Sequence, residues 1–232
     1  VFTSGGSLEH PTNTDYWTSA QLQEAERWPP VPPTEGRCVG DLFSVKRGIA
    51  TGANSFFLMT RTRAAQLRLP DAVLRAALPS PRDLPDPVID LAGDLVLLDC
   101  DAAAAADAAG PVAEYLRSGV DLGLGERYLL ARRRPWYRQE QRAPAPFVCA
   151  YMGRRSALRV FWNKARLVGT NRWLLLYPKP GLDEVEAWDL LRSLQPEDAV
   201  AHGRQYGGGL HKLEPSELLR LPLRDQPFFS QG

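Results

Sequence analysis

Short apolar segments separated by polar, glycine-rich and proline-rich turns dominate the chain from residue 38 onward. Runs of this length, rich in branched and aromatic residues, are typical of strands. Residues 95–98 form a continuous apolar run, which predicts a strand buried on both faces. Residues 48–54 read as a turn between two strands. The predicted strands are 42–45, 56–59, 95–98, 147–151, 159–162 and 173–177.

Helical periodicity is strongest at 183–194. Asp183 and Glu186 fit a capping box, and an apolar stripe follows at helical spacing. Shorter helices are predicted at 18–28, 62–69, 71–78 and 111–116, the last with a proline at its first position and Gly119 as a stop. The alanine run 102–106 is helix or loop. The mixture predicts an α+β fold of mixed, mostly antiparallel sheets with short helices and long loops.

The chain divides into three parts by composition. Residues 1–37 are rich in glycine, proline and threonine and predict an interdomain connector, with four prolines at 29, 30, 32 and 33 forming a stiff spacer. A compact domain is expected at 38–226, followed by a tail at 227–232. Because Val1 is not an initiator residue, we expect a fragment of a longer protein.

No apolar run approaches the roughly 18 residues of a membrane span, so a cytoplasmic protein without membrane contact is expected. The three cysteines, Cys38, Cys100 and Cys149, have the spacing of neither a disulfide framework nor a zinc cluster. We expect free, buried thiols in a reducing compartment and no metal site.

The net charge of +1 hides a strong separation of charge. Residues 127–172 hold twelve basic side chains against Glu140 alone, and residues 83–126 hold ten acids against Arg117 alone. Aromatic residues are interleaved with the basic ones, a pattern that predicts contact with a polyanion. The chain also contains 24 Arg against 4 Lys, as a GC-rich genome would give, so a merely solvated basic face stays open.

Signatures of catalysis are missing from the sequence. The Pro-Pro pairs lack the Asn or Asp and the aromatic residue that an amino-methyltransferase loop requires, and no Gly-x-Gly-x-x-Gly or phosphate-binding loop occurs. No acid stands two residues before any lysine, as a common metal-dependent nuclease would need. We therefore expect no covalent chemistry from this chain alone.

Three segments have residues suited to contacting a nucleic acid. RGIATGANSFF at 47–57 can bring backbone amides, a hydroxyl and an amide side chain close to a phosphate or a base edge, although an ordinary hairpin loop is equally compatible. RRRPWY at 132–137 offers guanidinium groups together with aromatics that could instead be core residues. QYGGGLHKLEPSELLRLPL at 205–223 contains a triple glycine that permits close approach of a sugar-phosphate chain or gives a flexible loop.

Four segments taken together resemble the C-terminal target-recognition domain of gamma-class, TaqI-like adenine-specific DNA methyltransferases, including the fused restriction-modification enzymes. They are GDLFSVKRGIATGANSFF (40–57), RRRPWY, an N-x-A-R-x-x-x-x-N element (Asn163, Ala165, Arg166, Asn171) and YGGGLHKLEPSELLRLPL. Their order and spacing match over about residues 38–224. The acidic stretch 83–126 is less typical of the family.

The resemblance implies a role for this chain in reading duplex DNA. An upstream catalytic domain of the same polypeptide would bind S-adenosylmethionine and methylate a flipped adenine. The basic stretch would form one wall of a DNA cleft, and the acidic stretch would face away. Two alternatives remain: the binding domain of an RNA-modifying enzyme, and a protein-interaction module in which the two charged stretches pair.

The DNA-contacting residues are expected in three groups. One rim of the cleft would carry Lys46, Arg47, Thr51 and Asn54. Phosphate clamps, guanine contacts or stacking would come from Arg132, Arg133, Arg134, Trp136, Lys164, Arg166 and Arg172. The other rim would carry Tyr206, Gly207, Gly208 and Lys212.

Overall fold

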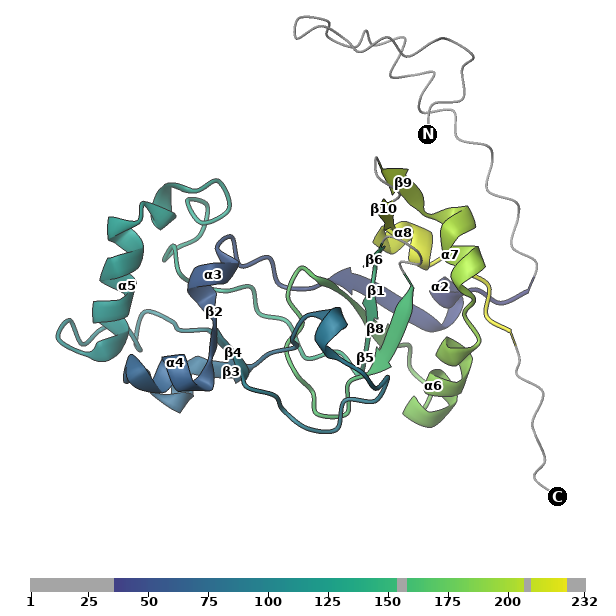
Figure 1. Cartoon of the computed structure of the whole chain (residues 1–232), viewed down its shortest axis with the longest axis horizontal. Helices are drawn as coiled ribbons and strands as arrows, with labels where there is room; N and C mark the ends of the chain where they lie inside the picture. Colours follow the sequence, from purple (N-terminus) through teal and green to yellow (C-terminus); the bar gives the residue numbers. More distant parts are fainter. Residues whose placement is uncertain (1–35, 154–157, 207–209, 225–232) are drawn as a thin grey trace, which may run out of the picture.

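The computed structural model describes residues 36–153, 158–206 and 210–224. Almost all of the predicted connector, including the helix at 18–28, lies outside these residues, as do Gly207 and Gly208. The described strands form three antiparallel sheets, joined by short helices and long loops (Figure 1). The predicted α+β fold is confirmed.

The largest sheet has four strands in the order β1-β8-β5-β7. These are β1 (Phe43–Arg47), β8 (Trp173–Pro178), β5 (Phe147–Ala150) and β7 (Arg159–Trp162). Arg47 at the end of β1 pairs with Leu174 near the start of β8, and Ala150 at the end of β5 pairs with Trp173. The chain therefore leaves β1 and enters β8 at the same end of the sheet.

Both faces of this sheet are buried. On one face, Phe43, Phe147 and Leu174 pack against Trp188 and Leu191 in a core that also receives α2 (Val39–Leu42), α6 (Glu184–Arg192), α7 (Pro196–His202) and α8 (Pro215–Leu218). The opposite face buries the alternate side chains of the strands, including Val148, Phe161, Trp173 and Leu175, with Leu78 and Ile89. This burial explains why the two central strands, β5 and β8, are apolar along most of their length.

A second sheet forms the other end of the molecule, at the left of Figure 1. Its order is β2-β4-β3, with β2 (Leu58–Thr60), β4 (Leu95–Leu98) and β3 (Leu74–Ala76). Around it lie α3 (Asn54–Phe57), α4 (Arg61–Gln66), α5 (Pro111–Asp121) and the 3-10 turns Asp71–Val73 and Leu124–Glu126. The 3-10 turn Pro81–Asp83 lies beside the four-stranded sheet, where Arg159 of β7 donates to the Pro81 carbonyl at 2.8 Å. A third, small sheet joins β6 (Met152–Gly153), β10 (Leu210–Lys212) and β9 (Arg204–Tyr206).

Several predicted elements are confirmed. β1, β4, β5, β7 and β8 lie where the apolar runs place them, within one or two residues at each end. Asp183 caps α6, because its carboxylate accepts hydrogen bonds from the amides of Val185 and Glu186 at 2.8 and 2.9 Å. Residues 102–105 of the alanine run form a turn.

The predicted hairpin over 42–59 is wrong. β1 pairs with β8, β2 pairs with β4, and α3 lies between β1 and β2 because Phe56 and Phe57 are buried in the second core. The predicted helix at 71–78 is also wrong beyond its first turn, since residues 74–76 pair with β4. The helix that starts at Pro111 continues past Gly119, where a Cβ would lie 2.5 Å from the Trp136 ring.

Candidate nucleic-acid interface

The segment 48–54 is joined to the segment 168–173, which lies more than a hundred residues later. Gly48 donates its amide to the Trp173 carbonyl, and Ile49 donates to Gly169 and accepts from the amide of Asn171, each at 2.9 Å. A Cβ on Gly48 would stand 2.1 Å from the Thr170 carbonyl oxygen, so only glycine permits this approach. The segments 48–54 and 168–173 are therefore held together by their backbones.

Thr51 lies inside this junction. Its side chain is 0% exposed, and its hydroxyl donates to the Asn54 side-chain oxygen at 2.5 Å and accepts from the Ala53 amide at 3.2 Å. The predicted DNA contact of Thr51 is therefore corrected. Its hydroxyl is buried and already donates one hydrogen bond and accepts another inside the protein, so it cannot reach DNA.

Arg133 fastens the same loop from the other side. Its guanidinium donates to the carbonyl oxygens of Ala50 and Thr51 and to the side chain of Gln139. Burial of the charged group lowers the pKa of Arg133. The sequence predicts a phosphate or guanine contact here, and the structure corrects it: both terminal nitrogens of Arg133 bind this loop and Gln139 inside the protein.

Three polar side chains remain at the surface of the junction. The Asn54 amide nitrogen lies 3.4 Å from the Asn171 side-chain oxygen, and Arg172 beside them is exposed, with no hydrogen-bond or ion-pair partner among the described residues. The backbone of Asn171 is fixed at both groups, since its amide binds Ile49 and its carbonyl accepts from the Tyr151 hydroxyl at 2.7 Å. Asn171 presents an exposed amide on a rigid backbone.

Arg47 and Lys212 share one carboxylate. Glu214 forms an ion pair with Arg47 and a second one with Lys212 at 2.7 Å. Burial of Glu214 acts to raise its pKa, but the Lys212 hydrogen bond and the charges of both cations outweigh it, so the pKa is lowered. Arg47 and Lys212 consequently lie side by side, which corrects the prediction that they stand on opposite rims.

Lys46 is separated from Arg47 by the alternation of side chains along β1. Its ammonium group lies 5.7 Å from the centre of the Tyr177 ring. Tyr177 packs on one face of the sheet and Val45 packs on the opposite face. The two neighbouring cations therefore point to opposite faces, and one bound duplex would meet them from different directions.

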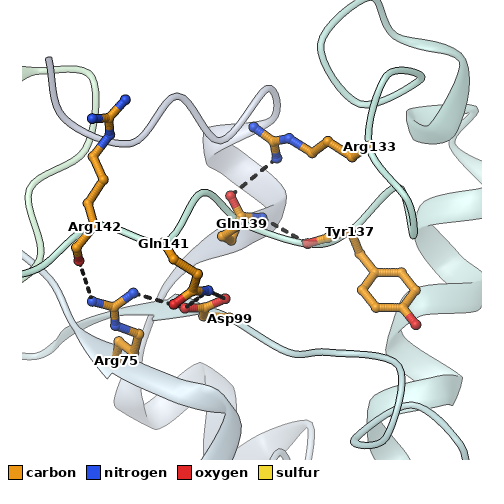
Figure 2. A network of polar contacts seen from close by, with 7 residues as sticks. All are labelled: Arg75, Asp99, Arg133, Tyr137, Gln139, Gln141 and Arg142. Carbon is orange, nitrogen blue, oxygen red and sulfur yellow. Dashed lines mark hydrogen bonds and ion pairs between the residues drawn. The ribbon is translucent and has the colours of Figure 1, made fainter.

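Residues 133–143 form a strap between the two larger sheets (Figure 2). Arg75 on β3 pairs with Asp99 at 2.9 Å and donates to the Arg142 carbonyl at 3.0 Å, while Gln141 lies 3.3 Å from the same carboxylate. At the far end of the strap, the Tyr177 hydroxyl donates to Ala143 at 2.8 Å. The strap fixes the second sheet to the first.

Trp136 belongs to the second core. Its ring centre lies 5.9 Å from that of Phe56 and 6.1 Å from that of Phe57, with Tyr137 edge-on to it at 5.7 Å. Of the two interpretations open for this aromatic, core packing is the one that the structure supports. The prediction that Trp136 stacks on a base is therefore corrected: Trp136 is a core residue.

Lys164 and Arg166 lie at the opposite end of the four-stranded sheet from Arg172. Arg166 forms an ion pair with Glu184 at the start of α6, and Lys164 lies 4.0 Å from Asp90 and 4.3 Å from the centre of the Trp162 ring. Trp162 pairs with Phe147, whereas Arg172 precedes Trp173, which pairs with Ala150. The basic stretch does not form one continuous wall, and its prediction as such is corrected.

Among the described residues, the two charged stretches make a single ion pair with each other. Ten of the twelve cations of 127–172 lie in the described part of the chain, and a carboxylate lies within 4.0 Å of three of them, Arg142, Lys164 and Arg166. Of these described cations, only Lys164 pairs with an acid of the stretch 83–126. Arg132 and Arg134 are exposed and donate only to nearby carbonyls. The described contacts therefore give no support to mutual pairing as the role of these charges.

We call the loop surface the set of exposed or half-exposed polar residues brought together at the end of β1 and the start of β8. It continues from the Asn54–Asn171 pair to the two cations on Glu214, because Tyr151 binds Asn171 through its hydroxyl and Leu213 through its carbonyl, the latter at 2.9 Å. The side chain of Tyr206 lies outside the described part, although its backbone pairs with Leu210 in the third sheet. The loop surface comprises Arg47, Asn54, Asn171, Arg172 and Lys212.

Sequence reasoning missed Asn171 as a site residue. The signal was present, since Asn171 closes the N-x-A-R-x-x-x-x-N element, but the element opens on Asn163, which has a different role. Asn163 is fully buried and holds the loop 163–167 together with hydrogen bonds to Ala145 and Leu167, each 2.9 Å long. The sequence element alone does not tell that Asn171 is exposed and Asn163 is buried. The difference follows from the tertiary structure, in which the backbone of Asn171 pairs with Ile49.

Cys100 and Cys149 are buried free thiols and Cys38 is a half-buried one. Burial raises the pKa of Cys100 to about 11 and that of Cys149 to about 12, so both stay protonated. Within the described ranges no helix combines the length and apolar character that a membrane crossing would need.

The family model and the curated relatives that match this chain are all type II methyltransferases. A family model described as the C-terminal domain of the type II methyltransferase M.Eco57I matches residues 17–231. The type II methyltransferase M.XamI of Xanthomonas campestris pv. amaranthicola is 31% identical over 219 residues, covering 87% of this chain and 40% of that protein. M.AccI of Acinetobacter calcoaceticus is 29% identical over 185 residues, covering 75% and 34%. The chain thus spans well under half the length of these curated relatives.

Two solved structures also match at low similarity. The type IIG restriction endonuclease BpuSI gives a TM-score of 0.48 at 18% identity, covering 80% of this chain and 23% of that one. The type IIL restriction-modification enzyme MmeI, solved in complex with DNA, gives a TM-score of 0.45 at 12% identity, covering 69% and 22%.

Proposed function

The chain belongs to the family of the C-terminal domain of the type II methyltransferase M.Eco57I, and from this premise we propose that it is the part of a site-specific DNA methyltransferase that reads duplex sequence. The family is the one that the four sequence segments indicate. In this proposal the parent polypeptide methylates adenine at N6 through another domain, which binds S-adenosylmethionine. This chain binds the target duplex and recognises its sequence.

One observation carries the proposal. The loop surface combines two amides and three cations on backbone that is hydrogen-bonded across segments distant in sequence. Base edges in the major groove are read by amide and guanidinium side chains, and phosphates are bound by cations. A fixed backbone matters because recognition requires donors and acceptors already placed for the base pair.

Methyl transfer is not assigned to this chain. The surface hollow of about 420 Å³ beside α6 is lined by apolar residues and Arg192. It offers no carboxylate to accept hydrogen bonds from ribose hydroxyls, so S-adenosylmethionine does not fit there. The resemblance to adenine methyltransferases supports placing the cofactor in the parent's other domain.

The proposal is tested by selection from a pool of duplexes with a randomised core, using the whole 232-residue chain at low salt. We expect one short motif to be enriched over successive rounds. Structured RNA is the competitor. Equal retention of RNA, or retention without any motif, would contradict sequence reading of DNA.

Arg172 and Asn171 have separate expected effects on the selected duplex. Arg172→Ala should reduce the slope of log affinity against log salt by about one, as for one lost phosphate contact. Asn171→Ala should relax one position of the motif, with a loss of about 1–3 kcal/mol of discrimination there. Arg192→Ala is the matched control, since Arg192 is an exposed arginine on α6 that pairs with Asp189; its slope and motif should equal those of the wild type.

A further inference from the structure

The turn at 127–133 exposes two large side chains side by side. Tyr128 is 72% exposed and Leu129 is 45% exposed, whereas the next residue, Leu130, is fully buried. Adjacent exposed apolar groups are costly in water and mark contact sites when they stand together on a fixed element. Neither residue has a place in the loop surface.

This turn is attached directly to the loop 50–54. Leu130 lies so close to Gly52 that a Cβ there would stand 2.9 Å from the Leu130 Cγ and 3.5 Å from the Leu129 Cβ. Arg133 reaches the carbonyls of Ala50 and Thr51 from the same turn. Tyr128 and Leu129 are therefore displayed on a rigid support next to the loop surface.

Arg132 holds the tyrosine in place. Its guanidinium carbon lies 3.5 Å from the centre of the Tyr128 ring, and the same group donates to the Tyr128 carbonyl at 3.1 Å. An arginine stacked on one face of an exposed aromatic restricts its rotation and leaves the other face available. The pair presents a flat apolar surface backed by a positive charge.

The charge around the turn selects the kind of partner. Residues 126–134 contain one acid, Glu126, against Arg127, Arg132, Arg133 and Arg134. Arg127, Arg132 and Arg134 are exposed and have no carboxylate partner among the described residues. Exposed aromatic and apolar side chains flanked in the chain by exposed arginines complement a nucleobase and its neighbouring phosphates.

We propose that Tyr128 and Leu129 are a wedge that contacts the bases of the duplex bound at the loop surface, with Tyr128 stacking on a base and Arg132 meeting the adjacent phosphate. The inference rests on the proposed function and adds the element that distorts the bound DNA. Apolar side chains that enter a base step unstack it locally, and cations beside them neutralise the phosphates that approach.

The test uses the whole chain and the duplex that it selects. Tyr128→Ala should weaken binding by about 5- to 150-fold, the range expected for one base–aromatic stack, and should leave the salt slope unchanged. Tyr128→Phe should bind as the wild type does. Arg132→Ala should lower the salt slope by about one. Leu91→Ala, at another exposed leucine, is the control and should have no effect.

A second readout locates the wedge. 2-Aminopurine placed in turn at each adenine of the selected duplex should brighten on binding at one step, and Tyr128→Ala should abolish the signal. Wild-type binding that is unaffected by Tyr128→Ala, with no fluorescent step, overturns the wedge and leaves sequence reading intact. Absence of duplex binding by the wild type overturns both proposals.

Discussion

The guanidinium of Arg133 donates a hydrogen bond to the main-chain carbonyl of Thr51, 82 residues earlier and 3.1 Å away. A second bond reaches the carbonyl of Ala50. A buried carbonyl that loses its donor retains the full cost of its desolvation, so this contact stabilises the loop that the candidate interface uses.

Replacement of Arg133 tests that assignment. Arg133→Ala should lower the free energy of unfolding by about 2–3 kcal/mol, because two carbonyls lose a charged donor. Arg133→Lys should recover part of the loss, since a lysine keeps the charge without the planar fork. Urea denaturation followed by circular dichroism measures both.

Arg134→Ala is the matched control for this experiment. Arg134 is exposed and donates only to the neighbouring carbonyls of Ala131 and Arg133, so its replacement should change stability by less than about 0.5 kcal/mol. Equal destabilisation by the two variants would show that Arg133 has no special part in holding the loop.

Glu214 gives the fold a defined dependence on pH. Its pKa in the folded chain is lowered by Lys212 and Arg47. A lowered carboxyl pKa contributes stability that is present above the ordinary glutamate value of about 4.3 and is lost as the pH falls through the folded value. Glu214→Gln removes this contribution at every pH.

The difference in unfolding free energy between wild type and Glu214→Gln is the quantity to measure, from pH 7 down to pH 3. It should be largest near neutrality and shrink below the ordinary glutamate pKa, because protonated Glu214 and glutamine are then alike. A difference that stays constant over this range would contradict an ion-paired Glu214.

The sequence predicts local structure well where one physical cause decides it. The run at 95–98 is a strand because Val96, Leu97 and Leu98 are all fully buried, and α6 starts at its expected cap, Asp183. Partners were not predictable in this way. β1 and β2 were assigned to one hairpin because they are neighbours in sequence, while tertiary pairing gives them to different sheets.

The candidate site shows the same division. The loop 47–54, Arg172 and Lys212 are identified by their residue types, and the structure brings parts of all three together. Side-chain direction was not available from residue type: Arg133 and Thr51 turn inward, while Asn171 and Arg172 turn outward. An arginine pattern alone does not distinguish a donor spent on the main chain from one that faces solvent.

Gly48 should tolerate no side chain. A Cβ at this position would lie 2.1 Å from the Thr170 carbonyl oxygen and 2.6 Å from that of Gly169, both of them backbone atoms. Gly48→Ala should therefore separate the two loops and cost about 2–3 kcal/mol of stability. Gly93→Ala, where nothing lies within 4 Å of the added Cβ, should be nearly neutral. Thermal unfolding of the two variants compares them, and similar midpoints would contradict the close approach.

Asn163 should matter for folding and not for DNA. Its side chain makes three hydrogen bonds inside the protein, two from its amide to the carbonyls of Ala145 and Leu167 and one accepted from the Leu167 amide. Asn163→Ala leaves these groups unpaired and should cost about 3 kcal/mol or more. Asn163→Asp should be at least as damaging, since a carboxylate would face two carbonyl oxygens.

The contrast with Asn171 makes the Asn163 prediction decisive. Both asparagines belong to one sequence element, yet Asn171→Ala removes only the weak 3.4 Å contact to Asn54 and should leave the unfolding midpoint nearly unchanged. At a temperature where Asn163→Ala is still folded, its salt slope on the selected duplex should equal the wild-type slope. A reduced slope at full folding would place Asn163 in the interface and contradict its burial.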